Sequence, residues 1–299
     1  MENQVSIKGY FAKDGVQKKF RELLGKKSTG FITSVMQVVN SNNLLAVATP
    51  ESVYNSAAMA ATLDLPINNN LGFAWIVPYK ENKKDAQGNW TSKTLAQFQI
   101  GWKGYVQLAQ RTGQYKAINV VEVYENQFKS FNRLSEELDA DFTLVGKGEV
   151  VGFVAYFKLI NGFEKTSYWS IEEVKAHGAK FSKTFSSANG VWKENFNAMA
   201  KKTVLKNTLS KWGILSIEMQ QAIIVDQAVI NDSETLDVDY VDAGNDKTVT
   251  IQEKEKLSNA DLLDVIAEIV ADNITLDGIM SQYELTDEQI KTIQDATTV

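Results

Sequence analysis

The stretch 97–125, QFQIGWKGYVQLAQRTGQYKAINVVEVYE, changes its hydrophobic period twice, and no other part of the chain constrains the fold as strongly. Residues 97–100 alternate between polar and apolar side chains, which is typical of a half-buried strand. Apolar residues then recur at helical spacing over 102–112, and Gly113 follows as a C-cap. After Tyr115 the apolar pattern predicts a further strand. The stretch therefore predicts a strand, a helix and a strand in succession.

The predicted helix at 102–112 has two chemically different sides. Lys103, Gln107 and Arg111 are spaced four residues apart and share one side. Trp102 and Tyr105 belong to the apolar side. A solvated face of an ordinary amphipathic helix explains this pattern, and so does a face that contacts a polyanion. The helix alone leaves both interpretations open.

A second stretch, 192–213, also predicts a helix with cations beside its apolar side. The narrow apolar stripe expected for this helix consists of Ala198, Leu205, Leu209 and Trp212. Lys202 and Lys206 lie one turn apart beside the stripe, and Lys201 flanks its other edge. A core helix bordered by lysines is the plain interpretation. The repetition of cations beside aromatic residues in two helices favours a shared binding function.

Charge is distributed unevenly along the chain. The 299 residues have a formal net charge of −6. Residues 1–225 carry 27 lysines and arginines against 19 acidic residues, a net +8, whereas residues 226–299 carry 4 lysines against 18 acidic residues, a net −14. A basic body with an acidic tail is typical of a polyanion binder with a separate interaction segment. A tail that only keeps the protein in solution is the alternative.

Local signals place several further elements. Residues 71–80 predict an aromatic-rich strand, and the polar residues 81–94 predict a flexible hairpin loop after it. Asn161-Gly162 between two apolar runs predicts a β-hairpin. Ser170 with Glu173 predicts a capping box at a helix start. These signals indicate an α+β fold.

The composition indicates a cellular compartment, and the sequence shows no motif that is typical of a catalytic site. The chain has no cysteine, its N-terminus lacks the apolar segment of a secretory signal, and no apolar run approaches the ~18 residues of a membrane span. These features favour the cytoplasm. The one histidine, His177, is expected at the surface, and no nucleophile elbow accompanies it. Gly146-Lys147-Gly148 lacks the spacing of a phosphate-binding Walker loop.

We therefore expect a binding protein and not an enzyme, with no catalytic residue, no metal site and no required cofactor. Mg²⁺ is expected only as a modulator. Three parts are predicted: a basic core at 1–225, an acidic linker at 226–256 and a small helical interaction module at 257–299. In the last part, Ser258 predicts a helix start and Thr286 with Gln289 predicts a second capping box.

Four segments of the chain resemble the RecT family of phage and prophage single-strand DNA annealing proteins. They are LDLPINNNLGFAWIVPYK at 63–80, the stretch 97–125, VAYFKLINGFEKTSYW at 154–169 and AMAKKTVLKNTLSKWGILS at 198–216. The resemblance spans roughly residues 15–225. One small departure is Lys206, which stands where many members carry arginine and so lacks the bidentate fork.

The resemblance implies an α+β fold with a small antiparallel sheet and packed helices. It also implies that the core at 1–225 binds DNA and oligomerises, and that rings or helical filaments of the protein on DNA anneal complementary strands without ATP. The partners implied are single-stranded DNA, the annealed duplex, further copies of the chain, a phage 5′–3′ exonuclease and the single-strand binding protein of a bacterial host. A protein that coats DNA or RNA without annealing it is the alternative function.

A basic groove that holds a strand by its phosphates imposes no sequence preference and leaves base edges open for pairing. The phosphate contacts predicted on this basis are Lys103, Arg111, Lys201, Lys202 and Lys206, with Gln107 as polar support. The aromatic residues predicted as base or sugar contacts are Trp102, Tyr105, Tyr115 and Trp212, and packing in the core is the alternative for each.

Overall fold

The structure is a computed structural model that describes residues 6–84, 88–182, 185–186 and 190–239, with scattered residues beyond 239. It divides into two compact units, Met1–Val249 and Thr250–Val299, which are described separately. The first unit is a mixed α and β structure with antiparallel sheets, so the predicted α+β class is confirmed.

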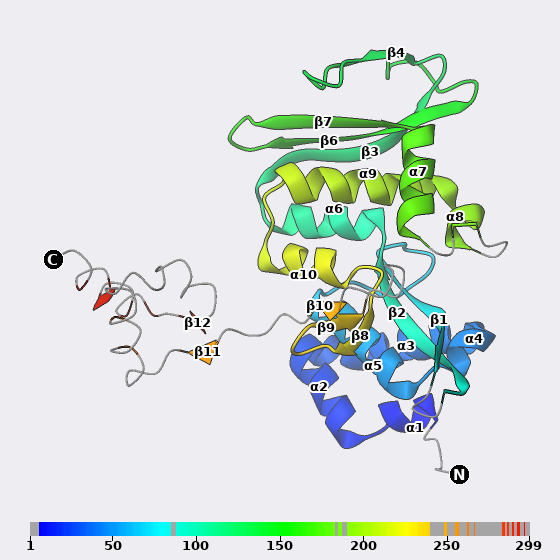
Figure 1. Cartoon of the computed structure of the whole chain (residues 1–299), viewed down its shortest axis with the longest axis vertical. Coiled ribbons are helices and arrows are strands. Elements are labelled where there is room, and N and C mark those ends of the chain that lie inside the picture. The colour runs from blue at the N-terminus through cyan, green and yellow to red at the C-terminus, as the bar shows by residue number, and fades with distance from the viewer. Residues whose placement is uncertain are drawn as a thin grey trace. The chain divides into compact units, whose positions relative to one another are not determined.

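The chain begins with a helical layer (blue in Figure 1). Its helices are α1 (Ile7–Phe11), α2 (Asp14–Leu24), the 3₁₀ helix η1 (Gly25–Lys27), α3 (Ser28–Ser41), α4 (Asn43–Ala46) and α5 (Pro50–Thr62). Thr49 stands at the N-cap of α5 and Pro50 at its first position, where a missing N–H costs nothing. The alanine-rich middle of α5 is buried, which brings its backbone close to β2 and β8.

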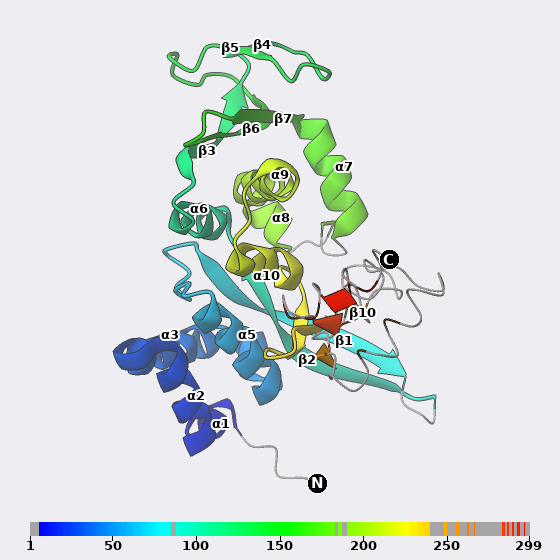
Figure 2. The same cartoon turned by 90° about the vertical axis from the view of Figure 1, so that its left-hand side faces the viewer.

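A long antiparallel hairpin follows, made of β1 (Ala74–Lys84) and β2 (Trp90–Ile100). It extends past the helices in Figure 2. The hairpin predicted at 81–94 is confirmed, but its loop is shorter than predicted, because the ladder continues to the pair Lys84 and Trp90. Polar side chains in this segment are exposed, but backbone pairing does not depend on their burial.

The second sheet has the order β3-β6-β7 and is antiparallel throughout. Its strands are β3 (Tyr115–Tyr124), β6 (Val150–Leu159) and β7 (Glu164–Ser170), and α6 (Trp102–Arg111) leads into it. The hairpin at Asn161-Gly162 is confirmed, and Gly162 has a φ of 94°, which an L-residue adopts with strain. The predicted strand, helix and strand of 97–125 are confirmed, although β2 and β3 belong to different sheets.

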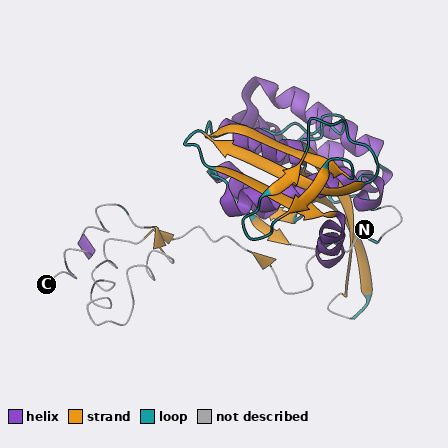
Figure 3. Ribbon diagram, turned by 90° about the horizontal axis from the view of Figure 1, so that it is seen from above, coloured by secondary structure: helices purple, strands orange, loops and turns teal. Residues whose placement is uncertain are grey.

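Helices cover one face of this sheet, as Figures 1 and 3 show. α7 (Ile171–Phe181) and α9 (Phe196–Trp212) lie against this face, α8 (Val191–Glu194) packs on α9, and α10 (Ile217–Val225) packs on α6 and β2. The capping box of Ser170 and Glu173 opens α7 as predicted. The short strands β4 (Phe128–Phe131) and β5 (Leu138–Ala140) pair with each other beyond the opposite face.

The narrow apolar stripe predicted for α9 is wrong at both ends, because Ala198 and Trp212 are exposed. α9 packs against α6 and against β3, β6 and β7, so it is buried on more than one side. The residues that it buries are Met199, Ala200, Lys202, Val204, Leu205, Thr208 and Leu209. A helix enclosed in this way has no single apolar arc.

The segment after α10 belongs to the first unit, which corrects the predicted boundary at 225 and the linker that followed it. Its strands are β8 (Val229–Asp232), β9 (Asp237–Asp239) and β10 (Thr248–Val249). Ala228, Ile230 and Val238 are buried, and Ala228 bridges to Phe98 of β2. The acidic residues of this segment obscured the buried apolar residues among them.

In the second unit, β11 (Glu255–Lys256) pairs with β12 (Tyr283–Glu284) in parallel. The capping box at Thr286 is confirmed: the Gln289 amide N–H donates to Thr286 Oγ1 at 3.2 Å, and the Thr286 N–H donates to Gln289 Oε1 at 3.0 Å. The start of the helix predicted at Ser258 lies outside the described residues.

Candidate nucleic-acid interface

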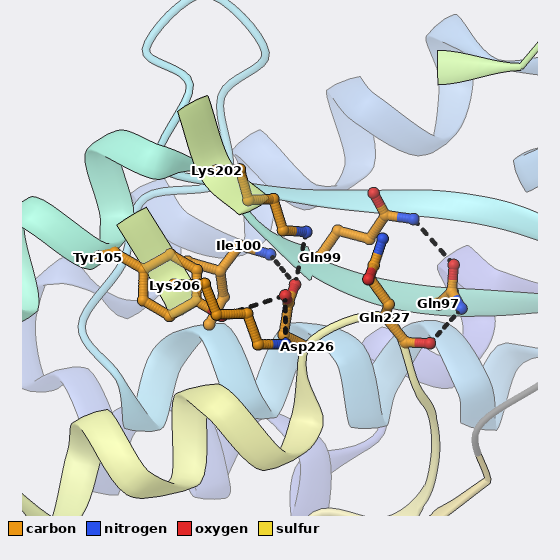
Figure 4. Close-up of polar contacts among 8 residues, drawn as sticks. All are labelled: Gln97, Gln99, Ile100, Tyr105, Lys202, Lys206, Asp226 and Gln227. Atoms are coloured by element: carbon orange, nitrogen blue, oxygen red, sulfur yellow. Dashed lines mark hydrogen bonds and ion pairs between the residues drawn. The ribbon is translucent and has the colours of Figure 1, made fainter. Parts of the chain in front are cut away.

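One buried carboxylate, Asp226, joins four segments of the first unit (Figure 4). Its Oδ1 accepts hydrogen bonds from Lys202 Nζ at 2.7 Å and from the Ile100 N–H at 3.0 Å. Its Oδ2 accepts from Lys206 Nζ at 3.0 Å and from the Tyr105 hydroxyl at 3.1 Å. The carboxylate therefore connects the end of β2, α6, α9 and the segment that precedes β8. We call these five residues the Asp226 cluster.

The charge of Asp226 is maintained by its neighbours. Burial alone would raise the pKa of this carboxyl, but the ammonium groups of Lys202 and Lys206 and the hydrogen bonds lower it to about 2. Asp226 is thus ionised at neutral pH. One carboxylate faces two ammonium groups, so the cluster retains one net positive charge.

The cluster separates the predicted site residues of α6 and α9 into two groups. Lys202 and Tyr105 are buried and bonded to Asp226, and their positions are those of core residues. The Lys206 side chain is 27% exposed, so its ammonium group is accessible while it contacts Asp226. Sequence reasoning did not find Asp226. The available signal was one acidic residue between the apolar runs 222–225 and 228–230.

Around Trp102, cations from two helices meet. Lys103 Nζ lies 5.8 Å and Lys201 Nζ lies 5.4 Å from the centre of the Trp102 ring. Lys201 also pairs with Glu122 of β3 at 2.8 Å, whereas Lys103 is exposed on α6. The structure therefore brings Trp102, Lys103 and Lys201 together, and Lys103 is the more accessible of the two cations.

Arg111 has a different environment from Lys103, although both were predicted on one side of α6. Its guanidinium donates to the carbonyl oxygens of Leu63 and Asp64, both at 2.6 Å, and lies 3.7 Å from the Asp64 carboxylate. These carbonyls follow the C-terminus of α5, where helix carbonyls lack partners. Arg111 therefore links α6 to α5. Gln107, on the same helix, is half-buried, and its Oε1 accepts no hydrogen bond.

The other two predicted aromatic contacts lie near the C-terminus of α9. The Tyr115 hydroxyl donates to the Ile214 carbonyl at 3.0 Å, and its ring packs on Phe157. Trp212 is 47% exposed, and Lys165 Nζ lies 3.8 Å from the centre of its ring. Tyr115 is thus in a structural position, and Trp212 offers a surface ring.

The β1–β2 hairpin carries a basic surface that sequence reasoning did not include. Lys80, Lys84 and Lys93 are exposed along its two strands. Trp90 is 71% exposed, and Lys84 Nζ lies 5.3 Å from the centre of its ring. The signal was the cation-rich composition of 80–93 beside a tryptophan, which had been attributed to a loop.

Neither a metal centre nor a membrane span is found where the structure is described. Within those residues, no three histidine, cysteine, aspartate or glutamate side chains gather closely enough to hold a metal ion. No described helix is both long enough and apolar enough to cross a bilayer.

The fold and these surfaces define a class: an α+β protein whose accessible cations stand beside aromatic rings, as in proteins that bind nucleic acid strands. The chain matches the RecT family over residues 29–240 and belongs to it. Members of this family are single-strand DNA annealing proteins of recombination. The match runs past residue 225 to include β8 and β9, in agreement with the corrected boundary of the core.

Two relatives show how far the similarity extends. The uncharacterized protein YqaK of Bacillus subtilis (strain 168) is 48% identical over 219 residues, which are 73% of this chain and 71% of YqaK. Protein RecT of Escherichia coli (strain K12) is 29% identical over 201 residues, which are 64% of this chain and 66% of that protein.

Proposed function

We propose that this protein binds single-stranded DNA and anneals complementary strands without ATP, as an oligomer or filament on the DNA. The observation that carries the proposal is the RecT family match, because it spans the elements from α3 to β9 that hold the cations described above. The cations themselves are compatible with phosphate binding but do not distinguish annealing from other uses.

Annealing requires that strands be held without covering their pairing edges. Lysines bind phosphates as point charges and impose no sequence preference. Lys103 and Lys206 are accessible cations of α6 and α9, and the exposed lysines of the β1–β2 hairpin add to the basic surface. Trp102 and Trp90 stand beside lysines, an arrangement that supports stacking of sugar or bases. Base pairing then stabilises the product, so no nucleotide hydrolysis is needed.

The proposed annealing function also implies partners, a cellular compartment and a role for metal ions. We infer that the protein works in the cytoplasm of a bacterial host, with a 5′–3′ exonuclease that supplies single strands and with the host single-strand binding protein. No cofactor is required in this scheme. Mg²⁺ modulates the reaction by screening phosphates, so it competes with the lysines.

The experiment that tests the proposal separates annealing from simple coating of nucleic acid. Two complementary oligonucleotides, each labelled with one member of a fluorescence pair, are mixed with and without the protein. An annealing protein increases the rate above the spontaneous one. A coating protein binds both strands but leaves the rate unchanged or lowers it, and that result would favour the alternative function.

A further inference from the structure

A cavity of about 300 Å³ lies between α7 and α9, beside the Asp226 cluster. Its α9 wall is formed by Thr203, Lys206, Asn207 and Ser210, which recur three and four residues apart and so share one helix face. Each of these side chains has at least one hydrogen-bond donor, and the Ser210 hydroxyl donates to the Asn207 carbonyl at 3.1 Å. The α7 wall includes His177 and the ring of Phe181, and Trp192 of α8 also lines the cavity.

The charge balance of this cavity favours an anion. Asp226 and Lys202 lie in its lining but are almost completely buried, with side chains 0% and 5% exposed. Lys206 is more accessible and has three N–H donors, of which Asp226 accepts one. The lining therefore combines one uncompensated positive charge with hydroxyl and amide donors, which are the partners that phosphate oxygens take in proteins.

His177 shares this cavity and is the only histidine of the chain. It was expected at the surface, but it is half-buried between the rings of Trp169 and Phe181, with ring centres 5.4 Å and 4.6 Å away. Burial, followed by the positive charges of Lys206 on α9 and Lys180 on α7, lowers the pKa of its imidazole. The remaining charged groups of the cavity, Lys202 and Asp226, are paired with each other. His177 is therefore neutral at pH 7.

We propose that this cavity holds one backbone phosphate of bound single-stranded DNA, with Lys206 as its cation, and that His177 takes up a proton when the phosphate binds. The inference rests on the proposed DNA binding and adds to it a particular subsite and a dependence on pH. Burial is the main cause of the lowered pKa of His177, and repulsion by Lys206 and Lys180 adds to it. An anion beside Lys206 offsets this repulsion, so the pKa of His177 is higher in the complex than in the free protein.

The coupling between proton uptake and DNA binding determines how DNA affinity changes with pH. Because the complex binds more protons than the free protein, DNA affinity rises as pH falls through the range between the two pKa values of His177. The rise is at most about tenfold for each unit by which DNA raises this pKa. Histidine is the only side chain that ordinarily titrates between pH 5 and 8, so a single substitution isolates the effect.

The test measures affinity for an oligothymidylate without terminal phosphates from pH 5.5 to 8, by fluorescence anisotropy at constant salt. The full-length protein should bind several-fold more tightly at pH 5.5 than at pH 8. The variant His177→Gln, which keeps a polar side chain but does not titrate, should bind with nearly the same affinity throughout. A thermal melt at each pH confirms that both proteins are folded.

A matched pair of lysines gives an independent measurement. Lys206→Met should flatten the plot of log affinity against log salt by about 0.7 and reduce the pH effect. Lys211→Met removes an exposed lysine of the same helix that does not line the cavity, and it should leave the pH effect unchanged. DNA binding with equal pH dependence in wild type and His177→Gln would overturn the inference and leave the proposed function intact. Absence of DNA binding by folded wild-type protein would overturn both.

Discussion

Asp226 connects residues that lie far apart in the chain, and its removal would take from the buried Lys202 the carboxylate that it contacts. Asp226→Ala should therefore lower the free energy of unfolding by about 3–5 kcal/mol, the usual cost of breaking a buried ion pair at one partner. Urea denaturation followed by tryptophan fluorescence measures this change. Asp14→Ala, which removes an exposed carboxylate from α2, is the control and should cost less than about 1 kcal/mol. Equal effects of the two substitutions would contradict the structural role of Asp226.

The same residue should make the protein sensitive to acid. The pKa of Asp226 is about 2 in the folded chain, below the ordinary value of 3.8. A carboxyl group whose pKa is lower in the folded chain stabilises the fold at every pH above its pKa in the unfolded chain. This stability is lost as pH falls from about 4 toward 2. The loss should be on the order of 2 kcal/mol. Asp226→Asn should be less stable at neutral pH and should show a correspondingly smaller loss over that range in parallel denaturation curves.

At the scale of the element, α6 presents two cations with different roles. Lys103→Ala should leave the melting temperature unchanged and flatten the salt dependence of DNA binding by about 0.7, because Lys103 is exposed. Its effect should be the same for every DNA sequence. The check is a salt titration of affinity beside a thermal melt. An unchanged salt slope would mean that this side of α6 is a solvated face.

Arg111→Ala should instead destabilise the fold by about 2 kcal/mol, because the variant loses two charge-assisted hydrogen bonds to the carbonyls of Leu63 and Asp64. Arg111→Lys should recover only part of this loss, since lysine lacks the planar fork. Thermal melts of the two variants test this assignment. A stable Arg111→Ala variant with a flattened salt slope would return Arg111 to the set of phosphate contacts.

At the scale of the whole molecule, the boundary of the core decides which truncations fold. A chain ending at Val249 keeps the complete first unit and should retain the cooperative unfolding of that unit. A chain ending at Val225 loses Asp226, β8 and β9, and with them buried residues that pack on β2 and α5. It should fail to fold. Circular dichroism melts of the two chains compare them, and a folded chain ending at Val225 would restore the linker interpretation.

What the sequence predicted well was encoded within a few residues. The Asn161-Gly162 turn and the Ser170 capping box each depend on neighbours at most three positions away. The burial of α9 depends instead on packing against α6 and the β3-β6-β7 sheet, so the helical wheel alone gave the wrong ends to its apolar side.

Contacts between residues far apart in the sequence also limited the prediction of the candidate site. Both α6 and α9 were found from their spacing, but Asp226 is 126 residues from Ile100 and 24 from Lys202, and no local pattern reports such contacts. Without Asp226, the sequence offered Lys202 and Tyr105 as DNA contacts, whereas the fold encloses both in the core. Only some of the residues predicted to contact DNA are therefore accessible in the fold, and they include Lys103, Lys206 and Trp212.

The central claim is that this chain anneals DNA by holding strands and letting base pairing supply the free energy. The most direct measurement is the annealing rate of two complementary oligonucleotides of unstructured sequence, followed by fluorescence with the full-length protein in the absence of any nucleotide. The rate should exceed the spontaneous rate, be unchanged by added ATP, and fall as salt rises because the contacts are with phosphates. A rate equal to the spontaneous one, or an acceleration that appears only with ATP, would contradict the claim.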